Sequence, residues 1–541
     1  MSDEKKRNVL AVVIDALRYD VIADDTLRAH LTPNLDRLAR RGFMRRVTTN
    51  APLTQFVLPS LFTQSYPFDH GGYNAGIRER PSSFVESIRE QGRFTYLAAS
   101  CYNYGIGQGY PRGFDSVLFL CDMTRNVKRV IVRTLAYNLE LCRGGELSKQ
   151  DVIEEVRKEF TALYKESLDL ADSIPRRNLF LRWLRWFNMN VAHGLKKELS
   201  LLEREPETVL RKLEAVDSPY YWTCLGRPRA GLKTFLHSKL DALRGILWRP
   251  LKGHVRFRRL ADVRVPCHLM LRETARVLGA CKSPWFAWVH LMDVHDFAYW
   301  QGLSDALCKL SLLFRLLRFR RRYSAARPLL HDLTLMQSDR ELGRMLDRLE
   351  RQGAMADTAV VVTADHGVHL KGMGPRPKQP LVSCFYSEHL HTPLIVSGVG
   401  EGPDATGMID SMSISSTILD LLGVEPTPGF LGVSALSTGR DFVISELAGP
   451  GNCDLDRRDL YFTVTTPTHR MMTVLREGDL KLLRLYNLRQ DPDEQQDLSA
   501  DGDCRAVTGG LVGVLLRERD EVFRRRGCDD ASRLSLTHAE F

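Results

Sequence analysis

Two apolar, β-branched runs constrain the fold of this chain more than any other feature. Residues 359–362 read AVVV and lead into TADHG, and residues 8–14 read NVLAVVI and end at Asp15. Runs of this kind are typical of strands buried on both faces of a parallel sheet. Ligands of open α/β sheets bind beyond the carboxyl ends of the strands, which is where Asp15, Asp365 and His366 stand. The pattern therefore predicts an α/β fold with polar side chains gathered at one edge of the sheet.

The three polar residues at these strand ends are candidate metal ligands. A carboxylate beside an imidazole is a suitable pair of ligands for a divalent cation, and Asp365 directly precedes His366. Asp15 offers a second carboxylate at the same expected edge. The alternative is that each aspartate caps a following helix.

Length and charge limit the classes of function. At 541 residues the chain is too long for one ordinary core, so we expect two domains or one large domain with insertions. A formal charge of +10 favours anionic partners such as phosphate esters, acidic lipids or polyanions. The sequence contains no zinc-finger spacing and no RNA-binding signature, so nucleic acid is not expected as a partner.

Cysteine usage and the charged first residues predict a cytoplasmic location. The 11 cysteines are scattered without a CxxC pair, and no apolar signal-peptide core follows the charged start. No apolar run is long enough to span a bilayer. Two basic, apolar stretches, residues 175–197 and 307–323, could lie on an anionic membrane. The alternative is that both are amphipathic helices packed on the main domain, with arginines facing water.

Motifs that follow one another along the chain resemble the sulfatase-like branch of the alkaline phosphatase superfamily. The resemblance covers roughly residues 8–120 and 280–500. The motifs are VIDALRYD (13–20), Thr54 with LFTQSYP (61–67) and the His70-Gly71 pair, WFAWVHLMDVHD (285–296), TADHG (363–367), YSEHLHTPLIV (386–396), DSMSISSTILDLLG (410–423) and LYNLRQDPDEQQDL (485–498).

The resemblance implies a large, mainly parallel central sheet sandwiched by helices, a helical insertion and a small α+β C-terminal subdomain. We place the N-terminal part of the catalytic domain at residues 1–121 and its C-terminal part at 280–400. A basic helical insertion is expected at 122–279, and the C-terminal subdomain and tail at 401–541.

By resemblance, Thr54 takes the position of the family's nucleophile. Asp15, Asp365 and His366 would then surround one metal ion together with Thr54. A threonine hydroxyl is a poor nucleophile, but it can ionise near neutral pH when a divalent metal binds it. The mixed ligand set suits Mn²⁺, Zn²⁺ or Ca²⁺. One metal is favoured over two, because relatives with a second metal use an Asp-x-x-x-His pair, whereas this chain has Asp293-Val294-His295, a different spacing.

Threonine at position 54 also bears on the substrate. Sulfatases proper use a formylglycine made from Cys or Ser, followed by Arg, whereas this chain has TQFVL at 54–58. We therefore expect a hydrolase or phosphotransferase that acts on phosphate (di)esters or phosphonate esters through a phosphothreonine. The alternatives are a sulfuric ester hydrolase and a non-catalytic protein of the same fold that binds a polyanion or a membrane.

Further candidates surround this set. His295 could donate a proton to the leaving group, and Asp293 could orient it or help bind a second metal. Substrate-binding candidates are Asn74, Lys371 and His391, with His389 as a rival to His391. Each could instead be an ordinary loop residue.

Overall fold

The computed structural model describes most of the 541 residues. Described are residues 8–73, 75–121, 135–214, 265–298, 303–320, 327–370, 381–400, 406–448 and 459–527, with the single positions 123, 127, 130, 402 and 455. Within these residues no helix is both long and apolar enough to span a membrane. None of the described cysteines forms a disulfide.

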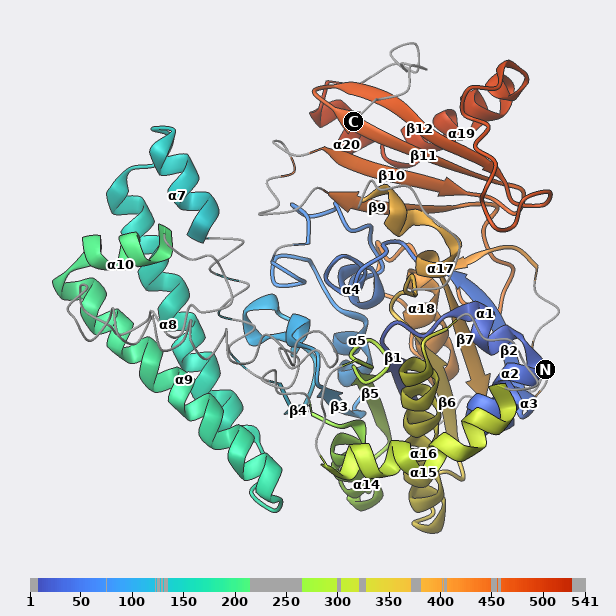
Figure 1. Ribbon diagram of the computed structural model, residues 1–541, viewed down its shortest axis with the longest axis horizontal. Helices are drawn as coiled ribbons and strands as arrows, with labels where there is room; N and C mark the ends of the chain where they lie inside the picture. The colour runs from blue at the N-terminus through green and yellow to red at the C-terminus, as the bar shows by residue number, and fades with distance from the viewer. Residues whose placement is uncertain are drawn as a thin grey trace.

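An eight-stranded sheet forms the centre of the molecule (Figure 1). Its order is β4-β3-β5-β1-β6-β7-β2-β8, and only β7 runs antiparallel to its neighbours. This confirms the predicted α/β fold with a mainly parallel sheet. The strands are β1 (Asn8–Ile14), β2 (Gly42–Thr48), β3 (Phe94–Ala99), β4 (Ser116–Phe119), β5 (Trp285–Leu291), β6 (Thr358–Thr363), β7 (His391–Ser397) and β8 (Ile409–Asp410).

The three central strands are the most apolar ones. Every residue of β5, β1 and β6 is buried, which explains their unbroken runs of aliphatic and aromatic side chains. Parallel pairing joins β1 to β5 on one side and to β6 on the other. The carboxyl ends of the three strands therefore lie next to one another.

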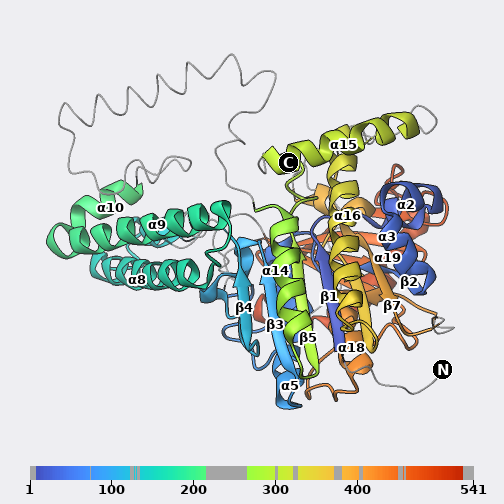
Figure 2. The same cartoon turned by 90° about the horizontal axis from the view of Figure 1, so that it is seen from below.

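Helices pack against this sheet in two groups. One group contains α2 (Asp25–Leu31), α3 (Pro33–Arg40), α14 (Cys267–Ala280) and α16 (Leu329–Arg351), with α15 (Leu303–Arg320) lying on α16 (Figure 2). In the other group α18 (Ser411–Leu422) contacts α4 (Thr54–Thr63), α5 (Phe84–Glu90) and β1. The short helix α1 (Tyr19–Ala23) follows β1, and α17 (Ser387–Leu390) precedes β7.

A helical extension projects from the sheet's β4 edge, at the left of Figure 1. It contains α7 (Ala136–Arg143), α8 (Lys149–Ser173), α9 (Leu179–Arg204) and α10 (Pro206–Glu214), of which α8 and α9 pack closely together. Its described part lies within the expected insertion. Residues 215–264 of that insertion lie outside the described residues.

A second, antiparallel sheet contains β9 (Val443–Ala448), β10 (Leu460–Thr465), β11 (His469–Arg476) and β12 (Asp479–Asn487). Two C-terminal helices, α19 (Arg505–Glu518) and α20 (Asp520–Arg525), accompany it. The expected segment 401–541 is therefore divided between the sheets, since β8 pairs with β2 and α18 packs against α4.

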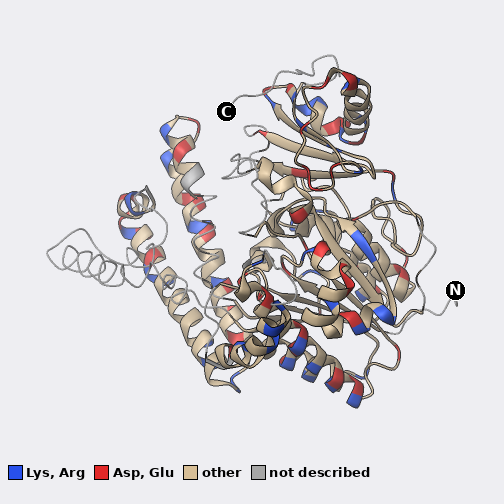
Figure 3. Ribbon diagram, turned by 45° about the vertical axis from the view of Figure 1, so that its right-hand side comes forward, with Lys and Arg blue, Asp and Glu red and all other residues tan. Residues whose placement is uncertain are grey.

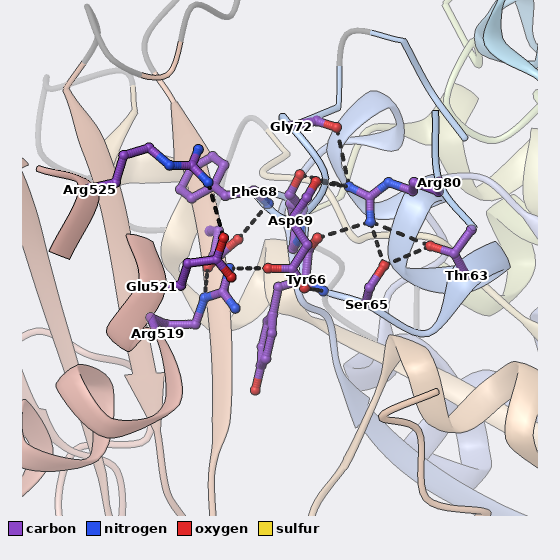
Figure 4. A network of polar contacts seen from close by, with 12 residues as sticks. Thr63, Ser65, Tyr66, Phe68, Asp69, Gly72, Arg80, Arg519, Glu521 and Arg525 are labelled. Carbon is purple, nitrogen blue, oxygen red and sulfur yellow. Dashed lines mark hydrogen bonds and ion pairs between the residues drawn. The ribbon is translucent and has the colours of Figure 1, made fainter. Parts of the chain in front are cut away.

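Two buried arginines stabilise the loop that follows α4 through hydrogen bonds and ion pairs (Figure 4). Arg80 donates to the carbonyl oxygens of residues 66, 67, 69 and 72 and to the hydroxyls of residues 63 and 65. Arg519 bonds Glu446 of β9 at 2.5 Å and Asp69 of this loop at 2.6 Å. The C-terminal sheet is thus joined to the loop after α4 by buried ionic contacts.

Replacing Arg519 with methionine is expected to lower the free energy of unfolding by about 3 kcal/mol, because the buried Glu446 carboxyl loses its cation. The free energy is measured by denaturation in guanidinium chloride. The matched control is Arg525→Met, whose partner Glu521 is exposed, so the change there should stay within about 1 kcal/mol. Equal effects of the two substitutions would contradict the structural role of Arg519.

Candidate active site

Four of the predicted site residues meet at the carboxyl edge of the main sheet. Asp15 follows β1, and Asp365 and His366 follow β6, whose residue Thr363 pairs with Val13. Thr54 is the first residue of α4. All four side chains are buried. Neither aspartate caps a helix within the described residues, because residues 364–370 after β6 form no helix and α1 begins only after Arg18.

The hydroxyl of Thr54 contacts two of the other residues. Its Oγ1 lies 3.2 Å from Oδ2 of Asp15 and 3.0 Å from Nε2 of His366. The same imidazole nitrogen is 3.6 Å from Oδ1 of Asp15 and 3.6 Å from Oδ2 of Asp365. The nucleophile candidate and the metal-ligand candidates therefore form one cluster.

The protonation of His366 follows from its second ring nitrogen. Nδ1 is 2.6 Å from the carbonyl oxygen of Gly367, and a carbonyl can only accept, so Nδ1 carries the proton and Nε2 keeps its lone pair. Glycine is required next to His366, because a Cβ at position 367 would lie 2.1 Å from the carbonyl oxygen of Glu388. The backbone of this loop thus fixes the ring with Nε2 directed at the cluster.

The donor set fits a divalent cation. Oδ1 of Asp15 and both carboxylate oxygens of Asp365 are buried and lack a hydrogen-bond partner, a state that is costly for a carboxylate unless a cation compensates it. The ligand atoms of Asp15, Asp365 and His366 all lie within 4.8 Å of one another. Burial alone would raise the pKa of Asp15, but the nearby His295, His290 and His366 hold it well below its usual range. These residues can hold the metal that the sequence predicts.

A second triad, Asp15, Cys101 and His290, also has metal-ligand geometry, but its hydrogen bonds assign it another role. Trp288 Nε1 donates to the hydroxyl of Tyr104 at 2.9 Å, and that hydroxyl lies 2.8 Å from Nδ1 of His290. An ionised carboxylate can only accept, so Nε2 of His290 carries a proton and donates to Oδ2 of Asp15 at 3.3 Å. In the neutral ring Nδ1 then accepts from the Tyr104 hydroxyl. His290 therefore orients Asp15 and has no lone pair directed at a metal.

His295 lies at the exposed rim of the cluster. Its ring stands perpendicular to that of His366, with the centroids 6.3 Å apart. Its Nδ1 lies 3.1 Å from Oδ1 of Asp296. Burial lowers the pKa of His295, but the carboxylates of Asp15, Asp296 and Asp365 outweigh this and raise it to about 9. These carboxylates favour the protonated ring, which can donate a proton.

Two aspartates lie close to His295 in the sequence, and the structure gives each a different described contact. Asp293 accepts a hydrogen bond from the backbone of Cys267, at the start of α14, whereas Asp296 contacts His295. A carboxylate next to the histidine was the signal that could have identified Asp296. His290 could have been noticed as a histidine in the middle of an apolar strand. Tyr104 lies far from β5 in the sequence and left no local signal.

The remaining candidates lie apart from this cluster or outside the described residues. Burial and Arg470 lower the pKa of His391, whose Nε2 lies 3.0 Å from Nη2 of that arginine, so its described contact is with the C-terminal sheet. His389 lies nearer the cluster, because its carbonyl oxygen accepts from the backbone of Gly367. Burial and the charge of His366 lower its pKa to about 3. Asn74 and Lys371 lie outside the described residues.

Comparison with known proteins finds similarity to sulfatases. The model of the family described as Sulfatase matches residues 263–424, less than a third of the chain. This span contains β5, β6, Asp365 and His366. A curated relative, N-acetylglucosamine-6-O-sulfatase of Bacteroides thetaiotaomicron, is 25% identical over 222 residues. This match covers 39% of the chain but only 36% of the relative, so it spans little more than a third of that protein's length.

Solved structures share the fold over nearly the whole chain. A 2-O GAG sulfatase superposes with a TM-score of 0.53 at 13% identity, covering 99% of this chain and 95% of its own. The phosphonate monoester hydrolase of Agrobacterium radiobacter gives a TM-score of 0.52 at 16% identity, covering 95% and 96%. At such identities these likenesses show a shared fold alone.

Replacing Asp365 with asparagine is expected to abolish metal-induced stabilisation. In the unchanged protein, Mn²⁺ or Zn²⁺ at 100 times its dissociation constant should raise the free energy of unfolding by about 2.7 kcal/mol. The D365N variant should show no such rise in a thermal denaturation series. Asp293→Asn is the control, since its carboxylate caps α14; loss of the metal effect there as well would contradict the assignment.

Replacing Tyr104 with phenylalanine is expected to weaken metal affinity about tenfold, because His290 loses the partner that fixes its tautomer and orientation. Affinity is measured by isothermal titration calorimetry. Tyr96→Phe, at a buried tyrosine of β3, serves as the control and should leave affinity unchanged. An unchanged affinity in Y104F would contradict the proposed role of His290 in orienting Asp15.

Proposed function

We propose that this protein is a metal-dependent hydrolase or transferase that acts on phosphate (di)esters or phosphonate esters, with Thr54 as the nucleophile. The observation that carries the proposal is the contact of Thr54 Oγ1 with both Asp15 and His366. An unmodified hydroxyl among candidate metal ligands suits direct attack on phosphorus. The family supports the coarser statement that the chain is a sulfatase-like hydrolase.

A divalent cation held by Asp15, Thr54, Asp365 and His366 would neutralise ester oxygens and favour the ionised form of the threonine hydroxyl. Thr54 gives up its proton to water and forms a bond from Oγ1 to phosphorus while the bond from phosphorus to the leaving oxygen breaks. The positive end of the α4 dipole lies at Thr54, where it favours the negative charge of the attacking oxygen and of the ester.

His295 is suited to move the protons of both half-reactions. As a cation it donates to the leaving oxygen, which departs as an alcohol. In its neutral form it then accepts a proton from the water or the acceptor alcohol that attacks phosphothreonine 54. This second attack breaks the bond from Oγ1 to phosphorus, and Oγ1 takes a proton back from water. With water as the attacking group, the product is phosphate from a monoester, a phosphate monoester from a diester, or a phosphonate from a phosphonate ester; an acceptor alcohol gives the corresponding ester.

Sulfate ester hydrolysis is the second candidate function. It is supported by the names of the relatives, among them N-acetylglucosamine-6-O-sulfatase. The chain departs from the sulfatases in the residue that they oxidise to formylglycine, because Thr54 provides neither Cys nor Ser. A hydroxyl without that modification must attack sulfur directly. A third candidate, binding without catalysis, is disfavoured by the complete set of ligands and nucleophile.

Parallel assays on nitrophenyl esters test the proposal. Phosphate monoester, phosphodiester, phosphonate and sulfate are offered with Mn²⁺, Zn²⁺ or Ca²⁺, and nitrophenol release is followed. We expect turnover of a phosphorus ester that requires metal and falls at least about a thousandfold in Thr54→Ala, because a covalent nucleophile is lost.

The control for the nucleophile is Thr63→Ala at the far end of α4, which should keep activity. Mass spectrometry of protein quenched during turnover should find phosphate on Thr54. Turnover of the sulfate alone would contradict the phosphoester proposal in favour of the second candidate. Metal binding without turnover of any ester would contradict catalysis on simple esters.

A further inference from the structure

The outward face of α15 is apolar, and this is unusual for a helix on a protein surface. Its exposed large side chains recur at helical spacing, at Leu307 (57% exposed), Leu310 (64%), Phe314 (78%) and Leu317 (43%). Single exposed apolar residues are ordinary, but a continuous stripe marks an interaction site. The opposite side of the helix is already buried at Leu312 and Leu316. A helix apolar on both sides needs a second apolar environment.

The charge of this outward face is positive. Arg315 and Arg318 are exposed beside the apolar stripe, and Asp305 is the one acidic residue of α15. Asp305 is buried and bonded to Lys309 at 3.0 Å, so it does not offset the arginines. Along α8, for comparison, Lys and Arg are interspersed with Asp and Glu; Figure 3 marks the charged residues on the ribbon. An apolar stripe bordered by arginines matches an anionic lipid surface, because aliphatic groups enter the acyl boundary and guanidinium groups meet phosphate.

Contacts with the main domain hold α15 at the end of the sheet where the candidate active site lies. Arg320 bonds Asp332 near the start of α16, and Arg340 farther along α16 donates to Ser311. α16 leads into β6 and runs in the opposite direction to it. The first half of α16 therefore lies toward the carboxyl edge of the sheet. Arg315 also donates to the carbonyl oxygen of His30 in α2. Figure 2 shows α15 lying across α16 at one end of the strands.

We propose that α15 is a membrane-contact helix that binds the protein peripherally to bilayers containing anionic lipids. Leu307, Leu310, Phe314 and Leu317 enter the interface, and Arg318 contacts lipid phosphate, while Arg315 stays bonded to the carbonyl oxygen of His30. This proposal does not rest on the proposed chemistry of Thr54. It places the candidate active site close to the headgroup layer.

Sedimentation of the full-length protein with vesicles tests the proposal. We expect binding to vesicles of phosphatidylcholine with phosphatidylglycerol, weaker binding to phosphatidylcholine alone, and a loss with added salt because the arginines are screened. The double variant Leu310→Ser with Phe314→Ser should bind about tenfold more weakly, since two inserted apolar side chains are removed. Arg318→Ser should lower binding to the anionic vesicles selectively.

Two controls isolate the role of α15. Trp186→Ser removes an exposed apolar side chain from α9 instead and should leave binding unchanged. Thr54→Ala should bind as the unchanged protein does, so a failure of the catalytic proposal is separable from a failure of this one. Circular dichroism and thermal denaturation verify that each variant is folded.

Three outcomes would overturn the proposal. The unchanged protein could fail to sediment with anionic vesicles, or the α15 double variant could bind as tightly as the unchanged protein. Analytical ultracentrifugation could instead find a dimer that the double variant dissociates, which would assign the α15 face to contact between two copies of this chain.

Discussion

Buried carboxylate oxygens without a hydrogen-bond partner, on Asp15 and Asp365, are the constraint on which the site depends. Because β1 and β6 pair in parallel, their carboxyl ends lie side by side, and the two acidic side chains that follow them lie close together. Two carboxylates in a dry interior cost several kcal/mol each unless a cation or a proton compensates them. The pairing of β1 with β6 therefore favours a cation between the two carboxylates. The imidazole of His366 and the hydroxyl of Thr54 complete the ligand set around that cation.

The surrounding structure holds this cluster in place. A chain of hydrogen bonds ends on Asp15. Trp288 donates to the Tyr104 hydroxyl, which contacts Nδ1 of His290, and Nε2 of His290 donates to Asp15. On the other side, α4 presents Thr54 from its first turn. The far end of α4 continues into a loop that Arg80 holds by hydrogen bonds. Arg519 connects the same loop to the C-terminal sheet. The nucleophile candidate is thus positioned by contacts from three separate parts of the chain.

Local sequence patterns predicted the elements that carry the site. The runs at 8–14 and 359–362 correspond to β1 and β6, and 410–423 to α18, with Asp410 as its cap and Gly423 ending it. Their composition is dictated by burial on both faces, which a single sequence reveals.

Long-range contacts could not be predicted in the same way. The sequence could not indicate that Arg470 of the second sheet lies against His391. Nor could it indicate that Asp293 accepts a hydrogen bond from the start of α14. The periodicity of α15 was visible in the sequence, but the structure was needed to distinguish its buried stripe from its exposed one.

Anomalous diffraction from crystals grown with Mn²⁺ or Zn²⁺ tests the central claim most directly. The account predicts one strong peak bounded by Asp15, Thr54, Asp365 and His366, with Oδ1 of Asp15 and a carboxylate oxygen of Asp365 about 2.0–2.2 Å from it. Absence of a peak at saturating metal would contradict the account. A peak on Cys101 and His290 instead would contradict both the ligand assignment and the proposed proton position on His290.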